Sequence, residues 1–164
     1  MNKFDIQSQA VIMCGISGSG KTQFARRLEE EGFSRLSTDA LIWEKVGTEL
    51  FKLSKEDRHR LFEECKVEVI RQLSNLLKSG RKAVVDATHC RRSVRDEIRN
   101  ICAARGVKPV FVYCYADKEE LLRRLSQRKG TGPDDLIVTP EEFSDYWLGF
   151  ERPQEDESDF IFLK

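Results

Sequence analysis

Apolar runs alternate with segments of helical periodicity along this chain. Residues 10–14 (AVIMC) are continuously apolar, a pattern typical of a strand buried on both faces of a parallel sheet. Between residues 21 and 31 the side chains of Phe24, Ala25 and Leu28 recur at helical spacing, and Gly32 supplies a stop signal. The pattern therefore predicts a strand followed by an amphipathic helix.

The same alternation continues to the last residues of the sequence. It predicts further strands at residues 33–37, 82–86, 107–115 and 160–163. It predicts further helices at residues 40–46, 54–79, 93–105, 117–125 and 139–149. Strands that alternate with helices in this order indicate an α/β domain of three layers with a mainly parallel sheet.

The length and composition indicate a single domain over residues 1–164. The hydrophobic share of 40% and the length of 164 residues suffice for one buried core, which excludes intrinsic disorder. The 28 basic and 28 acidic residues cancel, which argues against capture of long nucleic acid or of an anionic membrane by the whole surface. Binding of a polyanion is therefore expected to be local.

Targeting segments and metal frameworks are absent from the sequence pattern. No apolar stretch approaches the roughly 20 residues that a membrane span requires, and residues 1–5 lack the apolar region of a signal peptide. The five cysteines are odd in number and form no C-x-x-C pair, which argues against a disulfide framework and against zinc. We expect a cytoplasmic protein with reduced cysteines and no membrane partner.

An octapeptide directly after the first predicted strand matches G-x-x-x-x-G-K-[ST] in full: Gly15, Ile16, Ser17, Gly18, Ser19, Gly20, Lys21 and Thr22. Its glycines let successive backbone N–H groups form an anion nest, and the following helix adds the positive end of its dipole. We expect this loop to bind the phosphates of ATP, with Lys21 at the β and γ phosphates and the Thr22 hydroxyl on Mg²⁺. The alternative, a glycine-rich turn with a solvated lysine, does not explain the strand and helix that flank the motif.

The motifs of GTPases do not accompany this loop. Residues 86–89 (DATH) fail the D-x-x-G pattern that should follow a strand, and the only N-K-x-D match, at residues 2–5, precedes the phosphate loop. A segment so short cannot build a base pocket. The sequence therefore favours ATP over GTP.

Two carboxylates follow predicted strands, at the edge where open α/β sheets gather their ligands. Asp39 lies just after the second strand, where a kinase carboxylate accepts the proton of the acceptor hydroxyl. Its alternative role is to cap the helix over residues 40–46. Asp86 ends the third strand and is expected to hold Mg²⁺ through water as a Walker B acid, the alternative being simple solvation of the strand end.

Arginines gather in two places. Arg124 and Arg128 are spaced i, i+4 before the glycine-rich segment 130–135, so we expect a lid over about residues 124–139 whose arginines bind ATP and offset charge on the transferring phosphoryl group. The alternative is that both are simply solvated. A basic patch follows Asp86: Arg91, Arg92, Arg95 and Arg99. It either holds a phosphate of the acceptor or forms an exposed charged helix face.

With these residues in place, the chain resembles the P-loop kinases grouped as AAA-type ATP-binding proteins. The group includes polynucleotide 5′-hydroxyl kinases, zeta-toxin-like kinases and small-metabolite kinases, and the resemblance spans roughly residues 10 to 150. It implies a P-loop NTPase fold with a helical lid. It further implies that Asp39 is the general base, Arg128 the lid arginine and Arg95 a contact to the acceptor.

The chain departs from polynucleotide kinases on the acceptor side. Their D-x-T-N segment reads Asp86-Ala87-Thr88-His89 here, so His89 replaces an asparagine, and Ile42 stands where phage-type members carry an arginine. His89 is expected either to contact the acceptor or to be a loop histidine without a role. The motifs expected to bind ATP, which are the phosphate loop and the two lid arginines, are all present.

These patterns together predict an ATP- and Mg²⁺-dependent kinase that phosphorylates a hydroxyl. The acceptor is expected to be either a nucleic-acid 5′-end or a small metabolite. The alternative is a nucleotide-binding switch or ATPase that controls a partner protein. Incubation with ATP alone distinguishes the two, because the switch would show hydrolysis as its only activity.

Overall fold

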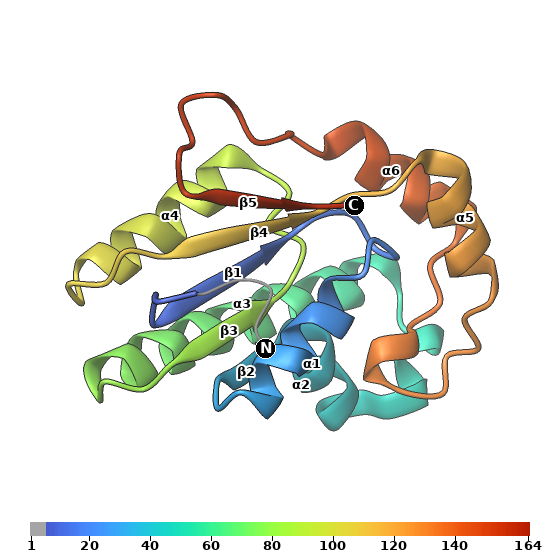
Figure 1. Ribbon diagram of the computed structural model, residues 1–164. Helices are drawn as coiled ribbons and strands as arrows, with labels where there is room; N and C mark the ends of the chain where they lie inside the picture. Colours follow the sequence, from blue (N-terminus) through green and yellow to red (C-terminus); the bar gives the residue numbers. More distant parts are fainter. Residues whose placement is uncertain (1–5) are drawn as a thin grey trace.

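The computed structural model of the protein describes residues 6–164, so the N-K-x-D match at residues 2–5 lies outside the described residues. One parallel sheet has the strand order β2-β3-β1-β4-β5 (Figure 1). Its strands are β1 (Ala10–Cys14), β2 (Ser34–Ser37), β3 (Ala83–Asp86), β4 (Val110–Cys114) and β5 (Phe160–Leu163). Every pairing between neighbouring strands is parallel, which the predicted strand–helix alternation requires.

Helices cover both faces of this sheet and give the three layers (Figure 1). The α-helices are α1 (Lys21–Glu30), α2 (Thr38–Val46), α3 (Lys55–Lys78), α4 (Arg92–Ala103), α5 (Lys118–Ser126) and α6 (Pro140–Gly149). Two short 3₁₀ helices, η1 (Gly47–Lys52) and η2 (Pro133–Asp135), lie in the connections after α2 and α5. The three-layer α/β fold expected from the sequence is confirmed.

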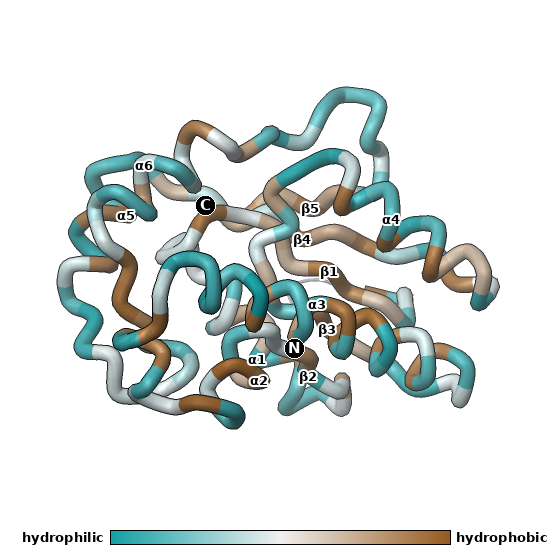
Figure 2. Tube along the Cα trace, turned by 180° about the vertical axis from the view of Figure 1, so that it is seen from behind, coloured by the Kyte–Doolittle hydropathy of each residue, from teal (hydrophilic) through white to brown (hydrophobic). Residues whose placement is uncertain are grey.

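The alternating side chains of the strands form two separate core clusters. On one face, Ile12 and Phe111 of the sheet pack against Leu73 of α3 and Ile98 of α4. On the other face, Met13 and its neighbours pack against α1. Figure 2 shows hydrophobic residues along the central strands and hydrophilic ones spread over the outer helices. Because β1 is buried throughout, the loop that follows it starts from a fixed point.

Capping places the start of α2 two residues earlier than the sequence indicates. The side-chain oxygen of Ser37 accepts a hydrogen bond from the backbone N–H of Ala40 at 3.2 Å, so Ser37 is the N-cap and the helix begins at Thr38. The alternative role of Asp39 as the cap is therefore wrong. Asp39 lies within the first turn, where its charge interacts favourably with the helix dipole.

The lid expected over about residues 124–139 is less helical than predicted. Helix α5 ends at Ser126, and between it and α6 only the three residues of η2 are helical. Arg128 consequently lies beyond the end of α5 rather than on its surface one turn after Arg124. Within residues 6–164, no helix has the length and apolar character needed to cross a membrane.

Candidate functional site

The phosphate loop leaves β1 at Gly15 and enters α1 at Lys21. Gly15 adopts a φ of +143°, and a Cβ atom on it would lie 2.2 Å from the carbonyl oxygen of Cys114, so only glycine fits. Gly18 and Gly20 also have positive φ, at +87° and +99°. These three glycines allow the tight curl that turns backbone N–H groups toward an anion.

Lys21 is buried at the first position of α1. Its Nζ donates a hydrogen bond to the carbonyl of Ile16 at 2.9 Å, so the ammonium lies inside the curl of the loop. Burial lowers the pKa of Lys21, while Asp86 and Asp39 act in the opposite direction. The opposing effect of these carboxylates shows that Lys21, Asp39 and Asp86 share one electrostatic environment.

The hydroxyl groups of the phosphate loop differ in exposure. Ser17 and Thr22 are half-buried, whereas Ser19 is buried and its Oγ has no hydrogen-bond partner within residues 6–164. A buried hydroxyl without a partner is uncommon in a native protein. The loop thus keeps unused polar groups where the motif predicts a ligand.

The register of β2 and β3 brings Asp39 and Asp86 to the same edge of the sheet. Ser37 pairs with Asp86, and Asp39 follows Ser37 by two residues. Asp39 is accessible to water, yet the protein packed around its carboxylate and the nearby Asp86 raise its pKa from 3.8 to about 6, against the charges of Lys21 and Arg128. A carboxylate with this pKa can exchange a proton near neutral pH.

Asp86 is buried at the end of β3 and is held by Arg35 of β2. The Nε and Nη2 atoms of Arg35 donate to the same oxygen, Oδ2, at 3.0 and 2.7 Å. Arg35 and its second partner, Asp134 of η2, were missed in the sequence analysis. An arginine within a predicted strand of an α/β sheet needs a counter-charge if it becomes buried, and that requirement was the available signal.

The two lid arginines have different partners. Arg124 donates from Nη1 to the carbonyl oxygen of Gly18 at 3.0 Å and from Nε to Glu120 at 2.6 Å, so it spans from α5 to the phosphate loop. Arg128 donates to the carbonyl of Leu136 at 3.0 Å and is close enough to Asp39 to affect its pKa. The structure thus places both arginines around the phosphate loop and Asp39.

His89 points into the protein rather than toward an acceptor. Its φ of +45° turns the chain back on itself, and Nδ1 lies 2.6 Å from the carbonyl oxygen of Met13. Since a carbonyl only accepts, Nδ1 carries the hydrogen in this contact. Burial lowers the pKa of His89 to about 4, so the ring is neutral at pH 7. His89 fastens the segment after β3 to β1.

Arg95 likewise does not face an open acceptor site. Its side chain is fully buried and pairs with Glu157, while Nη1 donates to the carbonyl oxygens of Glu151 and His89 at 2.9 and 3.2 Å. The rest of the basic patch is largely neutralised by the acidic segment 151–159: Arg92 pairs with Asp156, and Arg99 pairs with Glu157 and Asp159. Only the first arginine of the patch, Arg91, forms no side-chain pair with any described residue.

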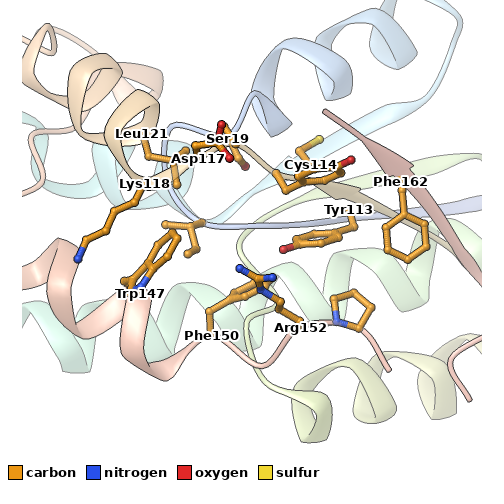
Figure 3. Close-up of a pocket in the computed structure, with 14 residues that line it drawn as sticks. Ser19, Tyr113, Cys114, Asp117, Lys118, Leu121, Trp147, Phe150, Arg152 and Phe162 are labelled. Carbon is orange, nitrogen blue, oxygen red and sulfur yellow. The ribbon is translucent and has the colours of Figure 1, made fainter. Parts of the chain in front are cut away.

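A cavity of about 780 Å³ opens beside the phosphate loop (Figure 3). Aromatic side chains dominate its wall: Tyr113, Tyr115, Trp147, Phe150 and Phe162. The rings of Tyr113 and Phe150 are stacked with centroids 5.6 Å apart, and the Nζ atom of Lys118 lies 5.6 Å from the Trp147 ring centroid. The Arg152 guanidinium extends among these rings and has no hydrogen bond or ion pair with any described residue.

The chemistry of this cavity suits a planar ligand. Aromatic side chains stack on the face of a heterocycle, and a free guanidinium donates to oxygen or nitrogen acceptors at its edge. The cavity meets the phosphate loop at Ile16 and Ser19. One wall of the cavity is formed by residues 150–153, which follow α6. This segment is joined to the residues after β3, because the backbone N–H of Glu151 donates to the carbonyl of Cys90 at 2.8 Å.

The residues expected to hold Mg²⁺ offer the oxygen ligands that this ion prefers. Asp86 has one carboxylate oxygen, Oδ1, to which no described residue donates, and Thr22 contributes a half-buried hydroxyl. The cysteines are free, and no group of three or more His, Cys, Asp or Glu residues within residues 6–164 is arranged to hold a metal ion. Mg²⁺ is usually held by one or two protein groups together with phosphate oxygens, which this pair provides for.

Two solved structures resemble the whole fold. The gluconokinase from Sinorhizobium meliloti 1021 aligns with a TM-score of 0.63 and 20% identity over 93% of this chain and 80% of that chain. A chain of the Pnkp1/Rnl/Hen1 RNA repair complex aligns with a TM-score of 0.70 and 20% identity over 90% of this chain and 45% of that chain. At these identities the likeness establishes the fold.

The amino-acid sequence also matches a protein family and one curated relative. The relative, named fructose-2,6-bisphosphatase, is from Saccharomyces cerevisiae; it is 25% identical over 179 residues, and the match covers 94% of this chain but only 39% of the yeast protein. The family, described as AAA domain, matches residues 11–153. Since this range contains the phosphate loop, both strand-end carboxylates and both lid arginines, the chain belongs to the AAA domain family, with the fold of the P-loop kinases.

Proposed function

We propose that the protein is a kinase that transfers the γ-phosphoryl group of ATP to a hydroxyl in the presence of Mg²⁺. One observation carries the proposal: Asp39 lies at the sheet edge beside Asp86 and Lys21, and its pKa of about 6 lets it accept a proton at neutral pH. A nucleotide-binding loop needs no such carboxylate for binding alone. The name of one structurally similar protein, a gluconokinase, supports the same conclusion.

The proposed reaction assigns a task to each charged group. Asp39 accepts the proton of the acceptor hydroxyl while the acceptor oxygen forms a bond to the γ-phosphorus. The bond between that phosphorus and the β–γ bridging oxygen breaks, and ADP leaves with the electron pair. Lys21 and Arg128 offset the negative charge on the transferred group, and Arg124 holds the lid against the loop at Gly18.

Mg²⁺ would be held by Thr22 and Asp86 with phosphate oxygens as further ligands. When bound, the ion neutralises charge on the β and γ phosphate oxygens. The chain's own contribution is to fix these two groups: Thr22 lies in the first turn of α1, and Arg35 fixes the orientation of the Asp86 carboxylate.

The cavity beside the phosphate loop suits the planar base of ATP rather than the acceptor, because its walls come mainly from β4, β5, α5 and α6, whereas Asp39 follows β2 at the opposite edge of the sheet. Its wall is aromatic, and it is joined through Glu151 and Cys90 to the segment after β3. Stacking of one base on such a wall contributes about 1–3 kcal/mol. For a nucleic-acid acceptor, the zero net charge agrees with contact to a short end rather than a long polyanion.

The deciding experiment is a transfer assay with ATP labelled at the γ-phosphate. The acceptors are 5′-hydroxyl oligonucleotides, nucleosides, sugars and sugar acids, and Asp39→Asn is the inactive control. We expect label on one of these acceptors with the parent protein only. Release of inorganic phosphate at the same rate with and without every acceptor would instead identify an ATPase or a nucleotide switch.

The role of the cavity is tested separately with Trp147→Ala. We expect this change to weaken the binding of ATP and to leave the KM for the acceptor unchanged. Leu148→Ala, on the same helix and 80% exposed, is the matched control. Unchanged ATP affinity together with a raised KM for the acceptor would instead assign the cavity to the acceptor.

A further inference from the structure

Arg35 connects two carboxylates that are far apart in the sequence. Its Nε and Nη2 atoms donate to Oδ2 of Asp86, and Nη2 also lies 2.7 Å from Oδ1 of Asp134. The three side chains are mostly buried, with exposed fractions of 11% for Arg35, 4% for Asp86 and 21% for Asp134. A single guanidinium thus joins the end of β3 to η2.

Asp134 belongs to a loop that has its own internal structure. We call residues 129–136 the lid loop. Within it, Asp135 accepts hydrogen bonds from the backbone N–H groups of Lys129 and Thr131 at 3.1 and 3.2 Å. At one end Gly130 packs on Phe51 of η1, since a Cβ on this glycine would lie 2.9 Å from the ring. Its polar attachment to α1 and β2 consists of the pairs that Asp134 forms with Arg26 and Arg35.

The geometry at Asp86 shows what Arg35 does to the carboxylate. Both donors of the planar guanidinium bind one oxygen, which fixes the carboxylate plane and leaves Oδ1 without a donor from any described residue. Oδ1 is therefore the oxygen available to a cation. The charge of Arg35 is at the same time shared with Asp134, so Asp86 is less completely neutralised when the lid loop is docked than when Asp134 has moved away.

We propose that Arg35 is a positioning residue that couples docking of the lid loop to the metal-binding state of Asp86. The coupling rests on the proposed function, in which Asp86 holds Mg²⁺. Docking of Asp134 draws on the charge of Arg35 and strengthens the attraction of Asp86 for Mg²⁺. By reciprocity, Mg²⁺ bound with nucleotide strengthens docking of the lid loop.

Two neighbouring aspartates of the lid loop provide a matched test. Asp134→Asn removes the pairing with Arg35, whereas Asp135→Asn removes the same charge one residue further along and keeps an oxygen for the N–H groups of Lys129 and Thr131. Two quantities are measured: amide exchange of residues 129–136, and the Mg²⁺ dependence of binding of a non-hydrolysable ATP analogue by calorimetry. Neither measurement requires phosphoryl transfer.

We expect Asp134→Asn to accelerate exchange in the lid loop and to raise the Mg²⁺ concentration needed for half-maximal binding about fivefold or more. Asp135→Asn is expected to match the parent in both measurements. Arg35→Met is expected to raise the Mg²⁺ requirement about 10- to 100-fold, the usual effect of removing a residue that orients a metal ligand. If Arg35→Met does not fold, the two asparagine variants still decide.

Two results would overturn the coupling. One is a lid loop freed by Asp134→Asn with the Mg²⁺ requirement of the parent, and the other is an equal rise in that requirement in Asp134→Asn and Asp135→Asn. Failure of the proposed function has a different signature. In that case the parent itself binds the analogue equally well with and without Mg²⁺, while exchange of the lid loop still differs between the two variants.

Discussion

Arg95 and Glu157 form an ion pair in which both side chains are completely shielded from solvent. Nε and Nη2 of the arginine donate to the two carboxylate oxygens at 2.9 and 2.7 Å, in the parallel geometry of a bidentate pair. The pair joins α4 to the segment that leads into β5. An arginine that the sequence suggested for substrate binding thus has a structural role.

Removing the charge of Glu157 should strongly destabilise the fold. Glu157→Gln leaves the Arg95 guanidinium buried without a counter-charge, a change that typically costs about 3–5 kcal/mol. Chemical denaturation checks this value. The control is Asp156→Asn, which breaks the exposed pair with Arg92 and is expected to cost less than about 1 kcal/mol. Equal losses in both variants would contradict the structural role.

The same pair predicts how stability depends on pH. Burial acts to raise the pKa of Glu157, but hydrogen bonds from Arg95, the backbone of Gln154 and Arg99 hold it at about 2, below its ordinary 4.5. A depressed carboxyl pKa adds stability that is complete above pH 4.5 and is lost as the pH falls toward 2. The difference in free energy of unfolding between parent and Glu157→Gln should therefore shrink across this range in denaturation experiments. A constant difference would show that packing, not charge, causes it.

Lys21 is expected to contribute to ATP binding and not to the stability of the fold. Because its Nζ bonds only one carbonyl of the phosphate loop, Lys21→Ala should keep the melting temperature of the parent to within a few degrees. Losing a charged hydrogen-bond donor should weaken ATP binding about 10- to 100-fold in calorimetry. Lys52→Ala, at an exposed position of η1, is the control. Unchanged ATP affinity in the folded Lys21→Ala variant would refute the phosphate site.

Asp39 is expected to act in transfer and not in binding. Asp39→Asn should lower the turnover number about 10²- to 10⁴-fold, the usual contribution of a positioned base, with ATP affinity within a few-fold of the parent. Its melting temperature should not fall, because Ser37 supplies the helix cap. The matched variant Ser37→Ala should instead lose about 1 kcal/mol of stability. Near-parental turnover of Asp39→Asn would end its assignment as base.

The raised pKa of Asp39 predicts an acid limb in the rate of transfer. Its carboxylate is the basic form, so kcat/KM for the acceptor should be constant well above pH 6 and fall tenfold per pH unit well below pH 6. The profile is measured at saturating ATP and Mg²⁺. An acid limb that is centred near pH 4 would mean that the environment of Asp39 changes when substrates bind.

Local patterns were sufficient for most of the fold. Apolar runs located β1, β3, β4 and β5, and the helix predicted over residues 139–149 begins at a capping box formed by Thr139 and Glu142. The phosphate loop was equally evident, because its function depends on residues that are adjacent in the sequence. These features share one property: the interactions that define them join residues only a few positions apart.

The parts that escaped prediction depend on distant partners. Nothing near Arg95 indicates that it is bonded to a glutamate 62 residues away, and nothing near Arg35 indicates Asp134, 99 residues away. The inward orientation of His89 depends on its contact with the carbonyl oxygen of Met13, 76 residues away, and its positive φ is uncommon for a residue other than glycine. In each case the residue itself is visible in the sequence, but its bonding partner is brought next to it only when the chain folds.

The buried pair of Arg95 and Glu157 also bears on the order of folding during synthesis. When α4 emerges from the ribosome, its central arginine has no counter-charge, because the glutamate is translated 62 residues later. Until then the guanidinium must stay in water, and the face of β4 that carries Phe111 cannot be sealed by Phe160 of β5. Closure of this part of the core therefore waits until β5 has been synthesised.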